Sequence, residues 1–283
     1  MKIKNWVILL ILFLFIFDGF VWLEILFHQK NKNTEIYFLD VGQGDSELVI
    51  LPGNIKVLID GGPDNSVLNS LASVVRPTDR YIDLMVLSHA QTDHFSGLID
   101  VLKRYRVGAF VYNGRSGTAP SWPELVKITE QNKIPVEILM AGDKISYLDN
   151  HFDILMPDKN FIQSADLNET VLVELLQSQS SKILFTGDAD TKIEDYLLQR
   201  YNLNVDVLKV AHHGSKFSSS EEFLKSISPK VAVIEVGKNS YGHPTPEALS
   251  RLASVGAQIF RTDKDGTVKL VINGENISIL KNK

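Results

Sequence analysis

The sequence predicts a two-layered α/β fold that follows one membrane-spanning helix. Short apolar strands alternate with amphipathic helices through residues 35–156, and a second series of strands and helices begins at residue 171. Such alternation is typical of sheets covered by helices. The 283 residues, of which 44% are hydrophobic and 22% charged, are enough to form a sizeable core.

Residues 6–27 form an apolar segment that is interrupted only by Asp18, Gly19 and Glu24. As a helix this segment would extend about 33 Å, at about 1.5 Å per residue, which is enough to span a bilayer. No cleavage site of small residues follows it, so we expect an uncleaved anchor. Asp18 near mid-span would cost about 3 kcal/mol, and the alternative is a buried amino-terminal helix of the globular domain.

The flanking charges indicate the orientation of this anchor. Lys2 and Lys4 precede the segment, and Lys30 and Lys32 follow it. With the free amino terminus added, the charge slightly favours an internal amino terminus and an extracellular globular domain. We therefore divide the chain into an anchor with a polar linker, 1–33, and a globular domain, 34–283.

The composition limits the chemistry of the globular domain. The chain has no cysteine, so any metal ion must be held by His, Asp, Asn or Gln. Residues 34–283 contain 25 Lys and Arg against 32 Asp and Glu, a net charge of −7. This balance argues modestly against tight, sequence-independent binding of nucleic acid, which needs a basic face.

The first series of elements is predicted from short apolar runs, from helical spacing of apolar residues, and from glycine and proline turns. The predicted strands are 35–39, 47–51, 56–60, 83–87, 109–112, 136–139, 144–148 and 152–156. The predicted helices are 67–75, 95–105 and 122–131. His151, beside the last turn of this series, belongs to no motif and is expected at the surface.

The most informative stretch of the series lies between the strand at 83–87 and the helix at 95–105. It places His89, Asp93 and His94 within six positions. Open α/β sheets bind ligands at the carboxyl ends of their strands, and imidazole and carboxylate groups suit zinc, manganese or iron. The alternative is a set of polar turn residues that cap the helix.

The second series contains the predicted strands 171–176, 182–186, 205–211 and 230–236, with helices at 191–199, at 221–227 and from residue 245. Three further strands, 258–262, 267–272 and 277–280, are expected to finish the second sheet. Asp265 and Gly266 provide a hairpin turn between the first two of these strands.

Five further motifs accompany the histidine cluster. They are DVGQGDS at 40–46, DGG at 60–62, TGD at 186–188, LKVAHHGS at 208–215 and YGHP at 241–244. The pattern H-x-x-x-D-H at 89–94 resembles the metal signature of the metallo-β-lactamase superfamily, whose common form has a third His where Gln91 stands. From Glu35 onward, the motifs together resemble the hydrolase domain of ComEC-type competence proteins and their stand-alone relatives. This resemblance implies an αββα sandwich, with two mixed sheets back to back and a metal cleft along one edge.

The resemblance also implies two metal positions that share Asp188. The first would be bordered by His89, Gln91, Asn168 and Asp188, and the second by Asp93, His94, Asp188 and His213. Gln91 and Asn168 are neutral amides and poor ligands for a divalent ion, and the ComEC-type group usually has Asp in place of Gln91. We therefore expect one firmly held zinc or manganese ion, with any second ion bound more weakly.

The two adjacent histidines are expected on an extended chain, where neighbouring side chains point to opposite sides. His213 is then the ligand, and His212 orients the site or faces the substrate. His243 would lie near the pocket, where it could donate a proton or bind a phosphoryl oxygen. The alternative for His243 is a turn histidine stacked on Tyr241.

Four more residues are assigned supporting roles by the resemblance. Asp60 would orient the metal-binding histidines, while Asp40, Asp45 and Ser46 belong to a glycine-rich loop at the rim of the pocket. The alternative for the loop is a plain glycine turn with solvated carboxylates.

The resemblance implies a metal-dependent hydrolase of phosphodiesters, with Asp93, Asp188, His212 and His243 as its catalytic residues. The substrate would be DNA or a phosphodiester polymer of the cell envelope. A different reading is a metal-free binding or accessory module of DNA uptake or the cell envelope, in which Gln91 and Asn168 mark lost chemistry. A β-lactam hydrolase is the least expected outcome, because the flanking motifs match the ComEC-type group.

Overall fold

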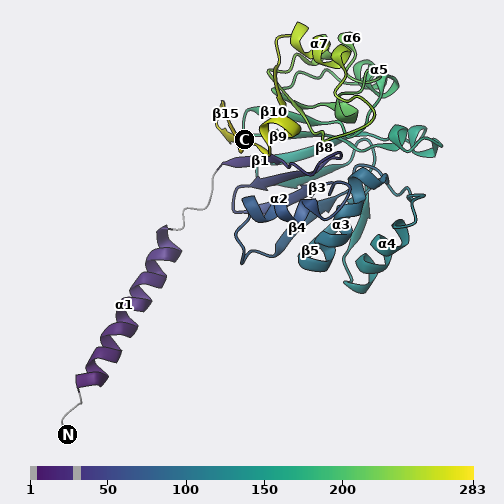
Figure 1. Ribbon diagram of the computed structural model, residues 1–283. Helices are drawn as coiled ribbons and strands as arrows, with labels where there is room; N and C mark the ends of the chain where they lie inside the picture. Colours follow the sequence, from purple (N-terminus) through teal and green to yellow (C-terminus); the bar gives the residue numbers. More distant parts are fainter. Residues whose placement is uncertain (1–4, 28–32) are drawn as a thin grey trace.

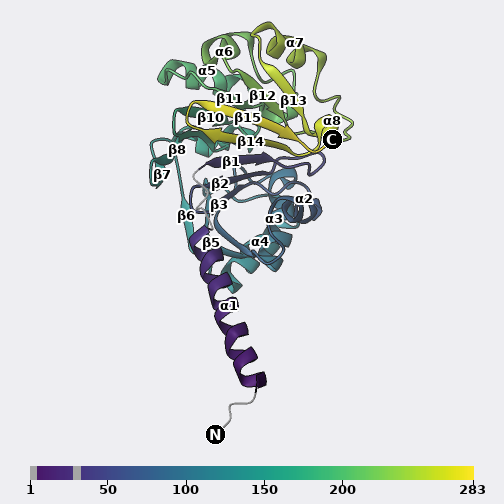
Figure 2. The same cartoon turned by 90° about the vertical axis from the view of Figure 1, so that its left-hand side faces the viewer.

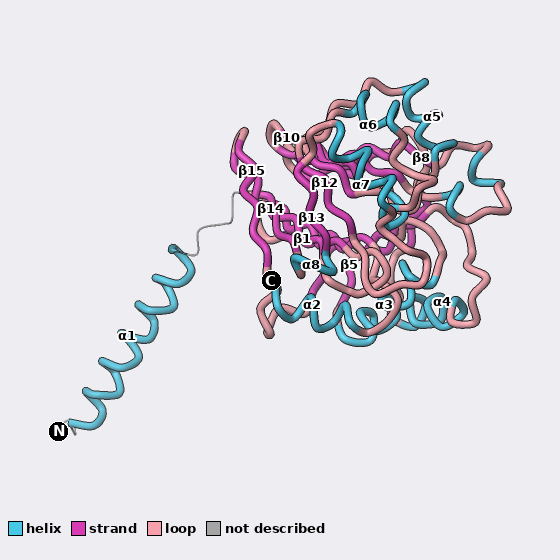
Figure 3. Tube along the Cα trace, turned by 45° about the horizontal axis from the view of Figure 1, so that its top comes forward, coloured by secondary structure: helices cyan, strands magenta, loops and turns pink. Residues whose placement is uncertain are grey.

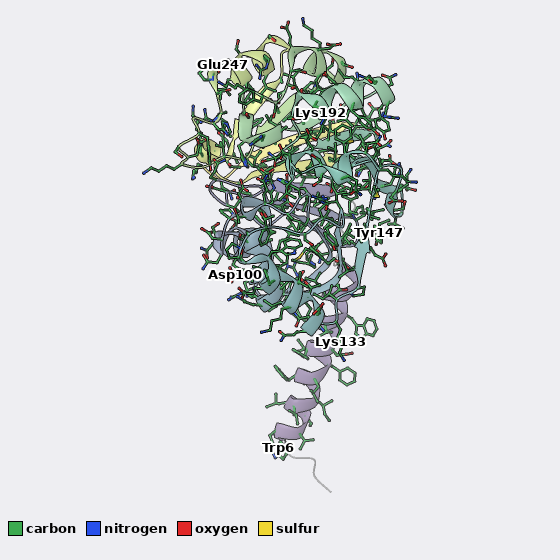
Figure 4. All side chains as sticks on the ribbon, turned by 90° about the vertical axis from the view of Figure 1, so that its right-hand side faces the viewer. Trp6, Asp100, Lys133, Tyr147, Lys192 and Glu247 are labelled. Atoms are coloured by element: carbon green, nitrogen blue, oxygen red, sulfur yellow. The ribbon has the colours of Figure 1, made fainter. Side chains whose placement is uncertain are left out.

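The computed structural model describes residues 5–27 and 33–283. Helix α1 (Asn5–Phe27) stands apart from a globular domain of two stacked sheets (Figure 1). None of the window Asn5–Trp22 is buried, and Figure 4 shows Trp6 on the part of this helix that lies far from the domain. The alternative of a buried core helix is therefore wrong; length and composition fit a membrane anchor or a signal sequence. Lys2, Lys4, Lys30 and Lys32 lie outside the described residues.

The first sheet has eight strands in the order β15-β14-β1-β2-β3-β4-β5-β6. Strand β1 is parallel to β3, β4, β5 and β6, because β2 is antiparallel to both β1 and β3. The strands are β1 (Thr34–Phe38), β2 (Glu47–Leu51), β3 (Ile55–Ile59), β4 (Tyr81–Val86), β5 (Arg106–Tyr112), β6 (Val136–Ile138), β14 (Val268–Asn273) and β15 (Asn276–Lys281). Helices α2 (Ser66–Val74), α3 (Thr92–Arg104) and α4 (Trp122–Gln131) cover the outer face (Figure 2).

The second sheet has seven strands in the order β13-β12-β11-β10-β9-β8-β7. These are β7 (Lys144–Tyr147), β8 (Asn150–Met156), β9 (Val173–Ser178), β10 (Ser181–Phe185), β11 (Val207–Lys209), β12 (Val231–Ile234) and β13 (Gln258–Arg261). Helices α5 (Thr191–Arg200), α6 (Glu221–Ile227) and α7 (Pro246–Ser254) lie over its outer face. Figure 3 shows the strands of both sheets in the middle of the domain and the helices around them.

Three apolar layers hold this arrangement together. The middle layer lies between the sheets and contains Phe38 from β1 and Phe185 from β10, whose ring centroids are 6.2 Å apart. Two further clusters fill the spaces between each sheet and its helices. Burial of apolar surface at about 25 cal/mol per Å² is the main stabilising contribution in such a core. The predicted two-layered fold is confirmed.

The last strands do not finish the second sheet as predicted. Strand β14 pairs with β1 in the first sheet, and β15 pairs with β14. The short helix α8 (Thr262–Asp265) and Gly266 replace the expected hairpin turn and carry the chain from β13 across to the first sheet. Strands β7 and β8 likewise belong to the second sheet rather than closing the first. Local patterns identified these strands but contained no information on which sheet they join.

Two local differences affect the site. Helix α3 begins at Thr92 rather than at residue 95, so Asp93 and His94 lie on its first turn and not in the turn before it. An acidic residue is favourable there because of the helix dipole. The strand predicted at 205–211 ends at Lys209, and residues Ala211–Gly214 form the 3₁₀ turn η3 with positive φ at His212 and His213. The prediction that the two histidines lie on an extended chain is therefore wrong.

Candidate metal centre

Polar side chains from four segments meet at the carboxyl ends of the strands. Asp60 follows β3, His94 lies on α3 after β4, Asp188 follows β10, and His213 follows β11. Because β3, β4, β10 and β11 end at the same edge of the sandwich, residues distant in sequence converge there. His151 lies on β8, half-buried and outside this group.

Four side chains form the centre of the group, namely Asp93, His94, Asp188 and His213. Each offers one ligand atom, and all these atoms lie within 4.8 Å of one another. His94 Nε2 is 3.4 Å from Asp188 Oδ1, and His213 Nε2 is 3.4 Å from Asp93 Oδ2. Two imidazole nitrogens and two carboxylates are a donor set that suits a divalent zinc, manganese or iron ion.

The buried polar atoms of this group support the same interpretation. His94 Nε2, His213 Nε2 and both carboxylate oxygens of Asp188 are buried without a hydrogen-bond partner among the described residues. An unsatisfied buried polar atom costs about 1–3 kcal/mol, so several in one place call for a common partner. A cation among them would satisfy all four atoms, and these residues therefore fit a divalent metal ion.

The charges of the four side chains are strongly coupled. Burial opposes ionisation of Asp188, but the charges of His94 and His213 hold its pKa well below the usual range. Burial would lower the pKa of His213, yet Asp188 and Asp45 raise it to about 10. Asp188 and Asp60 similarly raise the pKa of His94 against the effect of burial. The metal-free centre therefore holds protons where a metal ion would otherwise supply positive charge.

Asp60 holds His94 in position. Its Oδ2 accepts a hydrogen bond from His94 Nδ1 at 2.7 Å, and its two oxygens also accept from Ser88 N at 2.8 Å and Ser88 Oγ at 2.5 Å. Because Nδ1 is occupied in this way, the free Nε2 faces the centre. A carboxylate behind a ligating histidine fixes the ring and raises its basicity, which agrees with the role expected of Asp60.

Asp45 and Ser46 also lie beneath the centre. Asp45 Oδ1 is 3.2 Å from His213 Nδ1, which also donates to the carbonyl of Glu235 at 2.8 Å. Ser46 is buried, and its hydroxyl donates to the Asp60 carbonyl at 3.1 Å. Asp40, by contrast, forms an ion pair with Lys283 at 2.7 Å and stays outside the group.

Lys209 is a buried cation behind the centre that sequence reasoning missed. Its side chain is fully buried, and Nζ contacts Asp45 Oδ2 and donates to the Gly187 carbonyl at 3.0 Å. It thus joins the residue that supports His213 to the peptide that precedes Asp188. The sequence does contain a signal, because a lone lysine within the apolar strand 205–211 must find a partner when buried.

The first expected metal position is arranged differently. Gln91 Nε2 donates a hydrogen bond to Asn168 Oδ1, so the two amides satisfy each other across the position. His89 is fully buried, with Nδ1 at 3.0 Å from Ser88 Oγ and Nε2 without a partner among the described residues. Burial and the neighbouring His94 lower the pKa of His89 to about 3, so its ring is neutral.

His212 and His243 lie at the open side of the centre. The side chain of His212 is 31% exposed, and its Nε2 is 3.6 Å from Asp188 Oδ2. The ring centroids of His212 and His243 are 5.6 Å apart, and those of His243 and Tyr241 are 5.8 Å apart. The positive φ values of 50° at His212 and 53° at His213 turn one ring outward and the other inward. Non-glycine residues rarely adopt this conformation.

Two stacked sheets covered by helices, with a candidate metal centre at one edge, together define the class of protein. Residues 39–237 match the model of the metallo-beta-lactamase superfamily. The chain belongs to this superfamily, whose members are generally metal-dependent hydrolases that use divalent ions, commonly zinc or iron. The expected membership is confirmed.

The chain is also similar to curated proteins of bacterial competence. It is 29% identical to ComE operon protein 3 of Bacillus subtilis over 84% of this chain and 33% of that protein. It is 32% identical to competence protein ComA of Neisseria gonorrhoeae over 81% and 31%, respectively. This chain therefore spans about a third of the curated relatives that it matches.

Among solved structures, the chain resembles the metallo-beta-lactamase fold protein YhfI of Bacillus subtilis. The TM-score is 0.57 at 12% identity, covering 88% of this chain and 100% of YhfI. At this level of identity the likeness shows a shared fold.

Proposed function

We propose that this chain hydrolyses phosphodiesters with the help of one divalent metal ion held by Asp93, His94, Asp188 and His213. The observation that carries the proposal is the convergence of unpartnered buried atoms of His94, Asp188 and His213 within ligand distance of one another. A bound divalent ion lowers the pKa of water from about 15.7 to about 7 and so makes a nucleophile available at neutral pH.

Asp188 and Asp93 have different roles in the proposed reaction. Asp188 is buried and ionised, and it holds positive charge at the bottom of the centre. The side chain of Asp93 is 29% exposed, and although burial opposes its ionisation, the nearby ring of His213, 3.4 Å away, lowers the pKa of Asp93 to about 2. Asp93 is therefore an acceptor that faces the open side, where it can orient the attacking water.

His212 and His243 are placed to contact the substrate. Both rings lie at the open side, 5.6 Å apart, which suits them to donate hydrogen bonds to two oxygens of one phosphoryl group. Burial and the charge of His212 lower the pKa of His243, which favours the neutral ring. His243 then acts as a hydrogen-bond donor to a phosphoryl oxygen rather than as a proton donor.

The competence relatives favour DNA as the substrate. Three of the curated relatives are named for competence or recombination and are 28–32% identical to this chain. The net charge of −7 in residues 34–283 favours a transient encounter over tight DNA binding. A phosphodiester polymer of the cell envelope presents the same reacting group and would fit an extracellular, membrane-anchored domain.

The test uses the full chain purified in detergent. Hydrolysis of bis(p-nitrophenyl) phosphate, single-stranded DNA and teichoic acid is measured with added manganese or zinc, with Asp188→Asn as the inactive control. We expect metal-dependent hydrolysis of the small diester and of one of the polymers. Absence of hydrolysis with every metal, in a chain that binds one ion, would overturn the proposal.

A second candidate is a binding or accessory module that has lost its chemistry. The hydrogen bond between Gln91 and Asn168 favours it, because these amides occupy the position where a second ion would bind. This candidate predicts binding of the polymer without turnover, which the same experiment detects.

A further inference from the structure

The end of the domain opposite the metal centre carries an unusual concentration of positive charge. Three loops lie there, each between a helix and the next strand of the first sheet: α2 to β4, α3 to β5, and α4 to β6. These loops and the residues that flank them contribute five cationic side chains, which we call the basic rim: Arg76, Arg80, Arg104, Arg106 and Lys133.

The parts of the basic rim before β4 and before β5 adjoin each other. Strands β4 and β5 are parallel neighbours about 5 Å apart that begin in register, with Tyr81 opposite Arg106. Lys133 precedes β6, which begins opposite Phe110, four residues into β5. The loops before β4 and β5 touch directly, since Arg106 N donates to the Arg80 carbonyl at 2.9 Å. Arg76, Arg104, Arg106 and Lys133 are exposed, and Arg80 is half-buried.

The charges of the basic rim are not neutralised by the protein. No member forms an ion pair within residues 5–27 and 33–283, and the one acidic residue of the three loops, Asp79, pairs with Lys56 at 2.9 Å. Tyr81 is 41% exposed among these cations, with Arg106 over its ring at 5.9 Å. Cations interleaved with an exposed tyrosine are typical of surfaces that meet lipid headgroups.

The strand directions place this rim beside the entry of the chain from α1. Strand β1 is parallel to β4 and β5, so Thr34 at its start lies at the same end of the sheet as Tyr81 and Arg106. Figure 1 shows β1 beginning on the side of the domain nearest α1. Seven residue steps connect Phe27 to Thr34, which allow a separation of at most about 25 Å.

We propose that the basic rim docks on anionic phospholipid headgroups of the membrane in which α1 is anchored. Docking in this way points the metal centre away from the bilayer. Six residues of β4 and the three that lead to His89 place the centre about 20–30 Å beyond the rim. The acidic side chains of Asp40 and Asp64 at the opposite end, half-buried and exposed respectively, then face the aqueous phase. This inference does not depend on which reaction the centre performs.

The test measures how close each end of the domain lies to the bilayer. The chain has no cysteine, so Thr78→Cys in the α2 to β4 loop and Ser240→Cys after β12 each accept a single fluorophore; both positions are exposed. The full chain is reconstituted in phosphatidylcholine vesicles with or without phosphatidylglycerol, and energy transfer to headgroup-labelled lipid is recorded. We expect stronger transfer from position 78 than from position 240, and a further increase at position 78 with phosphatidylglycerol.

Charge removal provides the matched comparison. A cation near an anionic surface favours the docked state about five-fold, so Arg104→Gln with Arg106→Gln should reduce the ratio of docked to free domain about 25-fold. Lys216→Gln with Lys238→Gln, two exposed cations at the opposite end, should leave it unchanged. Equal transfer from both labels, or no response to phosphatidylglycerol and the arginine changes, would overturn the proposal. Loss of binding to a short DNA duplex, with unchanged transfer, would instead assign the basic rim to nucleic acid.

Discussion

The two candidate metal positions around Asp188 are built from the same part of the fold but differ in what they offer a cation. The position formed with Asp93, His94 and His213 presents charged and imidazole ligands whose buried atoms lack partners. In the other position, Gln91 and Asn168 are bonded to each other. A metal ion is attracted where the protein leaves charge and lone pairs unsatisfied, and not merely where side chains are close together. We therefore propose one strong site.

The largest effect is expected from the residue that both positions share. Asp188→Asn removes the buried charge, so we expect loss of bound metal and a decrease in hydrolysis of about 10³-fold, since a catalytic ion supplies several kcal/mol. Elemental analysis and initial rates check this. Asp195→Asn on the exposed face of α5 is the matched control. Metal retained at full occupancy in Asp188→Asn would contradict the proposal that the charge of Asp188 holds the ion.

A smaller effect on metal binding is expected from a substitution of Asp60, which lies behind the strong site. Asp60→Asn weakens the bond that holds His94, and the removal of such a supporting carboxylate typically costs about 10–100-fold in metal affinity. Competition with a chelator measures the affinity, and the exposed Asp64→Asn is the control. Unchanged affinity would mean that the ring of His94 is held by other contacts.

The pH dependence distinguishes the metal-free from the metal-bound centre. The pKa of His213 is raised to about 10, above its unfolded value of about 6.5, and that of His94 is also raised. The metal-free chain gains stability from these protonated rings below about pH 6.5 and loses it as the pH rises through about 10. The metal affinity depends on pH in the opposite direction and increases as the pH rises, because the ion must displace these protons.

We therefore expect the Tm of the chelator-treated chain to fall between pH 7 and pH 10. Over the same interval the apparent metal affinity should rise, by about ten-fold per pH unit for each proton displaced. Thermal denaturation and calorimetry in buffers of different ionisation enthalpy measure the two quantities. A metal affinity that is independent of pH would show that neither histidine is a ligand.

The smallest effect is expected at the weak position. Gln91→Ala breaks only the bond to Asn168, so metal content and hydrolysis should stay within about three-fold of the parent chain. Gln91→His adds an imidazole beside His89 and should increase the bound metal toward two ions per chain. Loss of the resident ion in Gln91→Ala would contradict the proposed difference between the two positions.

Much of the candidate site could be predicted from the sequence, because its residues follow apolar strands and the carboxyl ends of such strands meet. The resemblance to the metallo-β-lactamase superfamily proposed Asp93, His94, Asp188 and His213 as neighbours, and the structure brings them together. It missed Lys209, since its role depends on Asp45, 164 residues away. A long-range partner of this kind leaves no periodic signal.

In the fold, too, features that depend on nearby residues were predicted, whereas features that depend on residues distant in sequence were not. Strand and helix positions follow from local spacing, and nearly all elements lie within a few residues of their predicted bounds. The sheet that β14 and β15 join depends on pairing with β1, more than two hundred residues earlier in the chain. The backbone of His212 and His213 also could not be predicted, because positive φ at these residues reflects their tertiary surroundings.

The most direct test of one strong site is the number of metal ions bound per chain. The full-length protein is saturated with zinc or manganese, passed through a weak chelating resin, and analysed for metal and protein. We predict one ion per chain, lost in His213→Ala and retained in Gln91→Ala. Two ions of equal affinity, or none in a folded chain, would contradict this account.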